Sequence, residues 1–399
     1  MAVARPGPQG IVMILGPAYP AARLVAPKVV DHFVRHSRDA IGRSDGPVAP
    51  LPDAATIEAL IDAAFWASLR REETYVPKIS LAYVPPDIAP HPLLFERPLS
   101  LSAAALVKVA PAVERAGIHL GVWRDAAPTS GEALSVWGTI RTIPTLSVVV
   151  EVAAPGLLVV KHHRGEAGKF INVAVLEGDR VKVIDEQASS LPDCPPLLSS
   201  LLGFDSPASW DNGVDSVNIL VQLAVSMRAH GRGGVLLMVP PGSDVWQDSI
   251  VRPIPYAVAP AFAELAVLNR EPQELRQTRA WREAVYYTVQ AIAGLTAVDG
   301  ATVMTSDYEL VAFGAKIARR KGSPQVEQIT VTEPIEGDEA QALHPTQLGG
   351  TRHLSAAQFV HDQRDAIALV ASQDGRFTVF AWSPCESMVH AHRVETLLL

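Results

Sequence analysis

The stretch AVDGATVMT, residues 297–305, decides how the second half of the chain is interpreted. It follows a predicted helix over 280–295 and ends in ATVMT (301–305), a short buried strand. Asp299-Gly300-Ala301 stands at the junction, where an aspartate can present its carboxylate at a sheet edge and a glycine leaves bare backbone beside it. Asp-Gly is also a common turn dipeptide, so taken alone this motif fits a plain helix-to-strand turn.

Further predicted elements extend on both sides of this junction. They are helices over 214–229 and 257–270, strands at GGVLLMVP (233–240) and LVAFG (310–314), a loop over 319–350, a helix from Leu354, and strands at AIALVA (366–371) and RFTVFAW (376–382). Several helices that feed one sheet indicate a mixed α/β domain.

A second motif, Gly349-Gly350-Thr351-Arg352-His353, directly precedes the helix LSAAQFVHDQ. Free N–H groups at a helix start, a hydroxyl, a guanidinium and an imidazole together make a phosphate site. The alternative is a glycine loop with a helix cap, in which Thr351 or Ser355 only satisfies backbone amides.

The N-terminal part has a different pattern. Helices are predicted over 26–43 and 54–71, and short runs rich in Val, Ile and Leu follow from 76 to 186, which is typical of strands. Gly178 is expected to take a positive φ in a hairpin. We therefore predict an α+β, strand-rich domain over 1–190, a Pro-rich connector over 191–213 and a second domain over 214–399.

Composition limits the classes of function. The 399 residues are 48% hydrophobic and carry a net charge of −8, which excludes a wholly disordered chain and argues against binding to nucleic acid. Cys194 and Cys385 are too few and too widely spaced for a disulfide scaffold or a four-ligand zinc site. The longest apolar run, 146–160, contains Glu151 and a turn, so no membrane span is predicted. A cytoplasmic protein fits these observations.

Taken together and in this order, the two motifs resemble those of the diadenylate cyclase (DAC) domain family, Asp-Gly-Ala and Gly-Thr-Arg-His-Arg. The helix leading into GGVLLMV (233–239) and the closing strand pair AIALVASQDGRFTVFAW (366–382) are similar to further parts of that family. The resemblance covers residues 214–382 and none of the first 210. It implies a C-terminal mixed sheet flanked by helices.

The resemblance also implies roles for individual residues. Asp299 would bind a divalent metal, Mg²⁺ or Mn²⁺, that holds an ATP triphosphate. Gly300 and Ala301 would line the nucleotide. The second motif would hold its phosphates, through Gly350, Thr351, Arg352 and His353. The family joins two ATP molecules into cyclic di-AMP across two facing domains, so an active member would form a homo-oligomer.

Three departures weaken the enzymatic interpretation. Leu354 replaces the second arginine of the phosphate motif, and leucine supplies no charge. Ser372-Gln373 stands where the family has an acidic pair near the metal, which leaves Asp374 as the nearest carboxylate and the second candidate metal ligand. Residues between Asp299 and Arg352 include an acidic, Pro-containing insertion. The pattern resembles a divergent branch, DACNV, proposed as sensors in bacterial signalling and conflict.

Three hypotheses remain open. The first is a sensor that binds a nucleotide or cyclic dinucleotide, with an effector partner that the sequence does not identify. The second is an active diadenylate cyclase, and the third is a scaffold with a vestigial pocket. The retained Asp299 and Arg352 favour the first over the third.

Other features are expected to be structural. The sequence Lys161-His162-His163-Arg164 is interpreted as a solvated hairpin tip, and His390-x-His392 as part of a surface tail. The basic cluster at 316–321 is interpreted as a solvated edge that is able to reach nucleotide phosphates. Trp123 and Trp137 are predicted to lie in the core.

Overall fold

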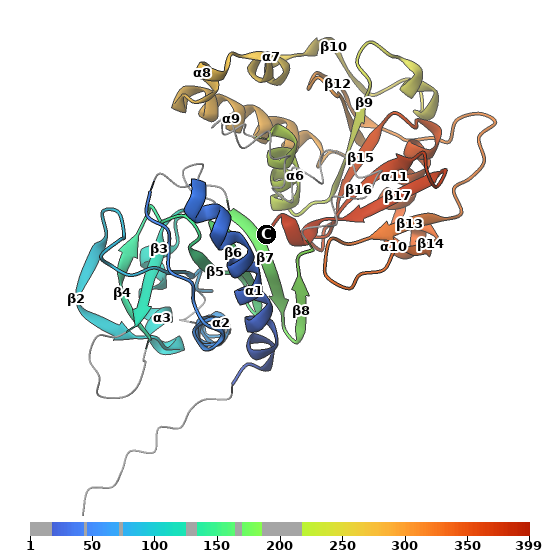
Figure 1. Cartoon of the computed structure of the whole chain (residues 1–399). Coiled ribbons are helices and arrows are strands. Elements are labelled where there is room, and N and C mark those ends of the chain that lie inside the picture. Colours follow the sequence, from blue (N-terminus) through green and yellow to red (C-terminus); the bar gives the residue numbers. More distant parts are fainter. Residues whose placement is uncertain (1–17, 44–45, 72–74, 125–133, 164–169, 186–217) are drawn as a thin grey trace, which may run out of the picture. The chain divides into compact units, whose positions relative to one another are not determined.

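The computed structural model describes residues 18–43, 46–71, 75–124, 134–163, 170–185 and 218–399 (Figure 1). The predicted connector lies outside them. The chain divides into two compact units. The N-terminal unit comprises Met1–Gly165 with Leu176–Val181, and the C-terminal unit comprises Glu166–Val175 with Lys182–Leu399. Each unit contains strands and helices, so the predicted mixed α/β class is confirmed.

The first half of the chain forms helices and then a strand-rich region, as predicted. Its elements are α1 (Pro20–Arg43), α2 (Ala54–Ser68), β1 (Ser80–Tyr83), β2 (Leu93–Ser100), α3 (Ala103–Val109), η1 (Ala110–Val113), β3 (His119–Arg124), β4 (Leu134–Ile140), β5 (Val148–Ala154), β6 (Leu157–His163), β7 (Phe170–Glu177) and β8 (Arg180–Val183).

These strands form a mixed sheet in the order β2-β4-β3-β1-β5-β6-β7-β8. Helix α2 packs on β5 and β6 and also contacts α1 and α3. Asp53 caps α2 by accepting the Thr56 N–H at 2.7 Å. Trp137 is buried, as predicted, and donates its indole N–H to the Val84 carbonyl at 2.8 Å. Gly178 has φ 59° in the β7–β8 hairpin, which confirms that prediction.

The second half of the chain contains a larger number of elements. They are α6 (Ile219–Ala229), β9 (Gly234–Val239), η3 (Val245–Ser249), β10 (Tyr256–Phe262), α7 (Glu264–Arg270), α8 (Gln273–Arg276), α9 (Arg279–Leu295), β11 (Ala301–Thr305), β12 (Leu310–Ala315), β13 (Ile329–Thr332), β14 (Gln341–Leu343), α10 (Pro345–Leu348), α11 (Thr351–Asp362), β15 (Ile367–Ala371), β16 (Phe377–Ser383), β17 (Met388–Arg393) and η4 (Glu395–Leu397).

Their sheet has the order β10-β12-β11-β9-β15-β16-β17-β13-β14, with helices on both faces (Figure 1). The sheet separates two hydrophobic cores, and strand β9 contributes side chains to both. Val235, Leu237 and Val239 point into a cluster that contains residues of α11. Leu236 and Met238 point into the opposite cluster, which contains residues of α6 and α9. This alternation is the period of two expected for a strand buried on both sides.

Several predicted elements require correction. The helix predicted over 257–270 is wrong in its first half, where edge strand β10 precedes the short helix α7. Pro260 explains the difference, because a proline inside a helix removes a hydrogen bond but is tolerated on an edge strand. The loop predicted over 319–350 contains β13, β14 and α10, and α11 begins at Thr351 rather than Leu354.

Two predictions of exposed histidines are also wrong. His162 and His163 are 4% and 7% exposed, because β6 is an interior strand with both faces covered. His392 is 3% exposed on β17, which pairs with β16 and β13 instead of forming a tail. Polar side chains in each segment suggested exposure, whereas their burial depends on neighbouring strands and helices that the sequence alone does not place.

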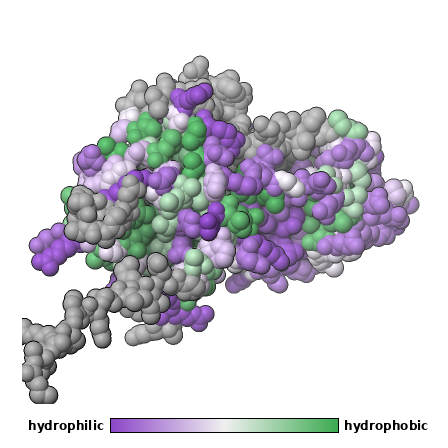
Figure 2. All heavy atoms as spheres, turned by 60° about the horizontal axis from the view of Figure 1, so that its bottom comes forward, coloured by the Kyte–Doolittle hydropathy of each residue, from purple (hydrophilic) through white to green (hydrophobic). Residues whose placement is uncertain are grey.

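The surface is mixed in character. On the face drawn in Figure 2, hydrophobic and hydrophilic residues are interspersed outside the grey atoms. Scattered exposed apolar side chains are normal for folded proteins, and Leu24, Leu93 and Leu94 are examples here. None of the helices in the described part of the chain combines the length and apolar character that a bilayer crossing needs.

Candidate functional site

The two sequence motifs meet at one edge of the nine-stranded sheet. In the β9–β11 register Ala301 pairs with Val235, so Asp299 and Gly300 lie at the same edge as Gly233. An ideal Cβ on Gly233, which has φ 71°, would lie 2.9 Å from Arg352 Nη1, so this guanidinium packs directly on bare backbone. We call this region the edge site and define it by Gly233, Asp299, Lys316, Thr351 and Arg352.

Asp299 presents its carboxylate to solvent, with 91% of the side chain exposed. Lys316, just after β12, donates a hydrogen bond from Nζ to Asp299 Oδ2. This hydrogen bond and the Lys316 charge hold the pKa of Asp299 below its usual value, and the positive charge of Arg352 adds to the effect. Asp299 is therefore an ionised, accessible carboxylate between two cations.

Gly300 has a packing role of its own. Its φ is 114°, which side-chain-bearing residues rarely adopt, and a Cβ would lie 2.5 Å from the carbonyl carbon of Gly314. Gly314 is restricted in turn, because its Cβ would lie 2.7 Å from a ring carbon of Tyr256. Ala301 opens β11 and is 1% exposed. Gly300 and Gly314 thus allow β11 and β12 to approach closely beside Asp299.

The start of α11 supplies unpaired donors. Gly350 is the N-cap and makes no side-chain cap, so the N–H groups of Thr351 and Arg352 lack helical acceptors. Within the described residues, neither the Thr351 hydroxyl nor the Arg352 guanidinium has a hydrogen-bond partner. Positive partial charge at a helix start adds to the Arg352 charge. These groups together suit an oxyanion.

A cavity of about 340 Å³ lies against these donors. It is lined by residues 348–353, 372–374 and Arg376. The turn between β15 and β16 forms the second wall, where Gly375 has φ 83° and the Ser372 N–H bonds the Arg376 carbonyl at 2.9 Å. Arg376 Nε lies 3.3 Å from Asp374 Oδ2. Asp374, the second metal candidate from the sequence, therefore reaches this edge but is already ion-paired.

His353 differs from the other residues of the motif. It is 3% exposed and its ring lies edge-on to Phe380, with centroids 6.0 Å apart. Burial lowers the pKa of His353, so the imidazole is neutral at pH 7. A Cβ on Gly349 would lie 2.2 Å from His353 Nδ1. Gly349 thus makes room for a buried ring whose edge reaches the cavity.

The basic cluster predicted at 316–321 separates into two places. Lys316 belongs to the edge site, whereas Arg320 and Lys321 line a different cavity. Sequence reasoning missed Gly233, whose only signal was a Gly-Gly pair before a strand. It also missed Tyr256, which stacks on Phe313 with ring centroids 4.7 Å apart and is 50% exposed next to Gly314.

Comparison with known families finds a match within the first half of the chain, outside the edge site. Residues 46–141 match the model of the family described as Probable sensor domain DACNV. No curated protein matches the chain. The matched region runs from before α2 to the end of β4, in the part that the sequence left without a role. Residues 46–141 therefore resemble the DACNV family that the sequence suggested, but the match lies outside residues 214–382, on which that resemblance was based.

Proposed function

We propose that the protein is a sensor with a nucleotide-binding C-terminal unit. The match of residues 46–141 to a probable sensor domain supports the sensing role. The edge site supports the binding role, and its ligand in this proposal is a nucleoside phosphate such as ATP or a cyclic dinucleotide. Bacterial signalling or defence is the setting that the DAC-like motifs suggest.

One observation carries the binding proposal. The amides at the start of α11, the Thr351 hydroxyl and the Arg352 guanidinium all face a cavity without partners among the described residues. Unmade hydrogen bonds from several donors at one point favour an anionic ligand there. Tyr256, which is exposed and stacks on the half-buried Phe313, offers an aromatic surface near the same edge, which suits a base.

A divalent metal fits the edge site only together with phosphates. Within the described residues no group of three His, Cys, Asp or Glu side chains suits a metal ion. Mg²⁺ often uses one or two carboxylates and completes its octahedron with water and substrate phosphates. Asp299 can supply such a carboxylate once a metal replaces Lys316, and Asp374 is the second candidate. When bound, the metal would neutralise phosphate charge.

The alternative is an active diadenylate cyclase. The position of the sensor match favours it, because a sensor in the N-terminal unit leaves the C-terminal unit free to produce an output. Leu354 and Gln373 argue against it, since neither side chain supplies the charge that a transferring phosphoryl group requires. We therefore rank binding without turnover first.

Two measurements on the full chain separate these functions. Calorimetric titration with ATP and Mg²⁺ should show binding that Asp299→Ala and Arg352→Gln weaken, while Asp307→Ala, an exposed aspartate after β11, leaves it unchanged. Incubation with ATP and Mg²⁺ or Mn²⁺, followed by chromatography, should give no cyclic dinucleotide. Multiple turnovers that vanish in Asp299→Ala would establish the cyclase instead, and absence of any nucleotide binding would remove both.

A further inference from the structure

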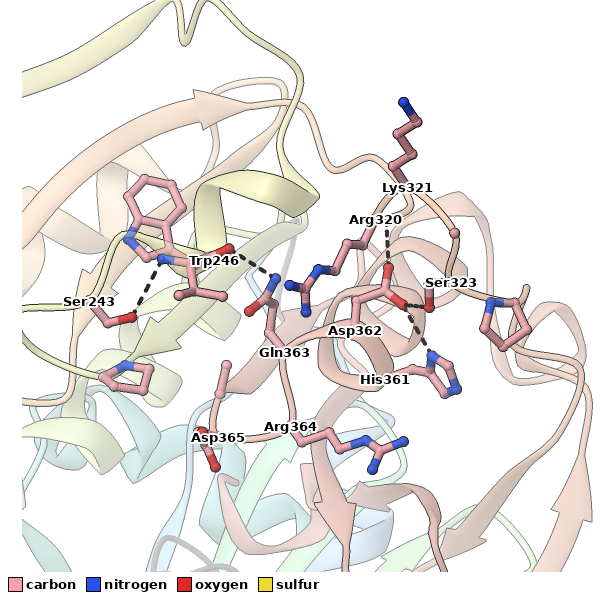
Figure 3. A pocket seen from close by; sticks show the side chains of 15 residues that line it. Ser243, Trp246, Arg320, Lys321, Ser323, His361, Asp362, Gln363, Arg364 and Asp365 are labelled. Atoms are coloured by element: carbon pink, nitrogen blue, oxygen red, sulfur yellow. Dashed lines mark hydrogen bonds and ion pairs between the residues drawn. The ribbon is translucent and has the colours of Figure 1, made fainter.

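A second, larger cavity lies at the opposite end of α11. Strand register places Pro240 and Ala366 at the sheet edge away from Gly233, because Ile367 pairs with Met238 while Ala371 pairs with Gly234. A helix of α11's 12 residues spans about 18 Å, which separates this cavity from the edge site. The volume is about 620 Å³, within the range of small-molecule sites. We call it the helix-end pocket (Figure 3).

Asp362 fixes one wall of the helix-end pocket. Its side chain is fully buried. Its carboxylate accepts the Arg320 backbone N–H at 2.8 Å, the Ser323 hydroxyl, and the Gln358 amide N–H at 3.0 Å. His361 Nδ1 lies 3.1 Å from the same carboxylate. The loop that carries Arg320 and Lys321 is thereby attached to the end of the helix.

The neighbouring Gln363 fixes the facing wall. Its side-chain amide donates to the Val245 carbonyl at 3.1 Å and to the Ser249 hydroxyl at 2.9 Å. Trp246 anchors the same segment in the hydrophobic core. In Figure 3 the Arg320 guanidinium extends toward Gln363 between the two walls. Both walls are therefore held by adjacent residues of one helix end, which makes the cavity a preorganised site rather than a gap between mobile loops.

The charges at the helix-end pocket favour an anion. Arg320, Lys321 and Arg364 line it. Neither Lys321 nor Arg364 has a carboxylate within 4 Å among the residues that the structure describes. Arg364 is held over the Trp382 ring at 4.1 Å, an arrangement that leaves its N–H donors available. The negative charge of Asp362 is satisfied by the donors around it, and Asp365 is the one remaining carboxylate of the lining. Asp248, outside the lining, lies 3.6 Å from Arg320 Nη2 and offsets part of the charge of that guanidinium.

We propose that the helix-end pocket binds a soluble organic phosphate, at a site separate from the edge site. The phosphate would lie on Arg364, whose planar guanidinium matches phosphate oxygens in pairs, while Arg320, which is ion-paired with Asp248 at 3.6 Å, and Lys321 add positive charge to the lining. The volume exceeds what one phosphate fills, so the remainder of the pocket accommodates the organic part. A second phosphate site at the other end of the same helix gives the C-terminal unit two ligands.

The test uses inorganic pyrophosphate as the probe and the full chain in the Arg352→Gln background, which removes the main cation of the edge site. Calorimetry at fixed ionic strength should still show binding. Adding Arg364→Gln should weaken the affinity about tenfold, as expected when one charged hydrogen-bonding group is lost. Adding Arg141→Gln, an exposed arginine outside both cavities, should leave it unchanged.

Two results would overturn the proposal: no pyrophosphate binding in the Arg352→Gln background, or equal affinities in the Arg364→Gln and Arg141→Gln variants. Circular dichroism checks that each variant is folded. If Arg364→Gln does not fold, Lys321→Gln provides the same test, because its side chain is exposed and has no hydrogen-bond or ion-pair partner among the described residues. It should weaken binding severalfold, and an unchanged affinity would again contradict the site.

Discussion

Replacing Asp362 by asparagine should destabilise the C-terminal unit by about 3 kcal/mol. The two side chains have nearly the same shape, so the change replaces one acceptor oxygen by a donor and leaves the packing intact. If the amide nitrogen takes the place of Oδ2, it faces the Arg320 N–H, which is now 2.8 Å from an acceptor. If it takes the place of Oδ1, it faces the Ser323 hydroxyl and the Gln358 amide.

Either orientation leaves a buried donor unpaired, which costs roughly 1–3 kcal/mol. The remaining bonds also lose their ionic partner, and neutral hydrogen bonds contribute about half as much as charged ones. The two contributions together give the figure of about 3 kcal/mol. Because the side chain of Asp362 is fully buried, water does not replace the lost acceptor.

Urea unfolding followed by tryptophan fluorescence measures this change, since Trp246 and Trp281 are buried in the C-terminal unit. The matched control is Asp365→Asn, three residues further along and exposed, for which a change within about 0.5 kcal/mol is expected. Equal stabilities of the two variants would refute the assignment of Asp362 as the residue that holds the pocket wall.

Three further predictions concern other parts of the C-terminal unit. Gly300→Ala should cost at least about 1–2 kcal/mol in urea unfolding, because of its positive φ and the contact with Gly314, whereas Gly294→Ala, in open space on helix α9, should be neutral or stabilising by up to about 1 kcal/mol. Burial lowers the pKa of His392 to about 4, so between pH 6.5 and pH 5 the unfolded chain takes up a proton at this residue and the folded chain does not. The free energy of unfolding should therefore fall by about 2 kcal/mol from pH 7.5 to pH 5 on account of His392. The His392→Gln variant should lack this part of the fall. Arg352→Gln should weaken ATP binding about 10–100-fold without a comparable change in the urea midpoint, since this guanidinium makes no hydrogen bond or ion pair among the described residues. A loss of stability as large as the loss of affinity would assign Arg352 a structural role.

The elements with strong patterns were predictable from the sequence. Helix α9 and strands β9 and β11 follow their apolar periods, and the two motifs lie at one edge because parallel strands place their starts together. The short strands were missed for physical reasons. Strand β14 has three residues and β10 contains Pro260, so neither shows a period long enough to recognise.

The other features of the candidate site depend on contacts between residues that are far apart in the sequence. The sequence marks Gly300 as a turn residue. The structure shows that a side chain at this position would collide with Gly314, which lies close because β11 pairs with β12. His353 belongs to a phosphate-like motif, yet its ring is buried against Gly349 and Phe380. The helix-end pocket combines segments around 243, 320 and 362, which no local pattern connects.

The central claim is that the C-terminal unit holds a nucleotide at the edge site. A crystal structure of the full chain soaked with a non-hydrolysable ATP analogue and Mg²⁺ tests it most directly. We predict phosphate oxygens within about 3 Å of the Thr351 and Arg352 amides and of the Arg352 guanidinium, with Asp299 turned from Lys316 toward the metal. A nucleotide bound elsewhere, for example within residues 46–141, with the edge site empty, would contradict the account.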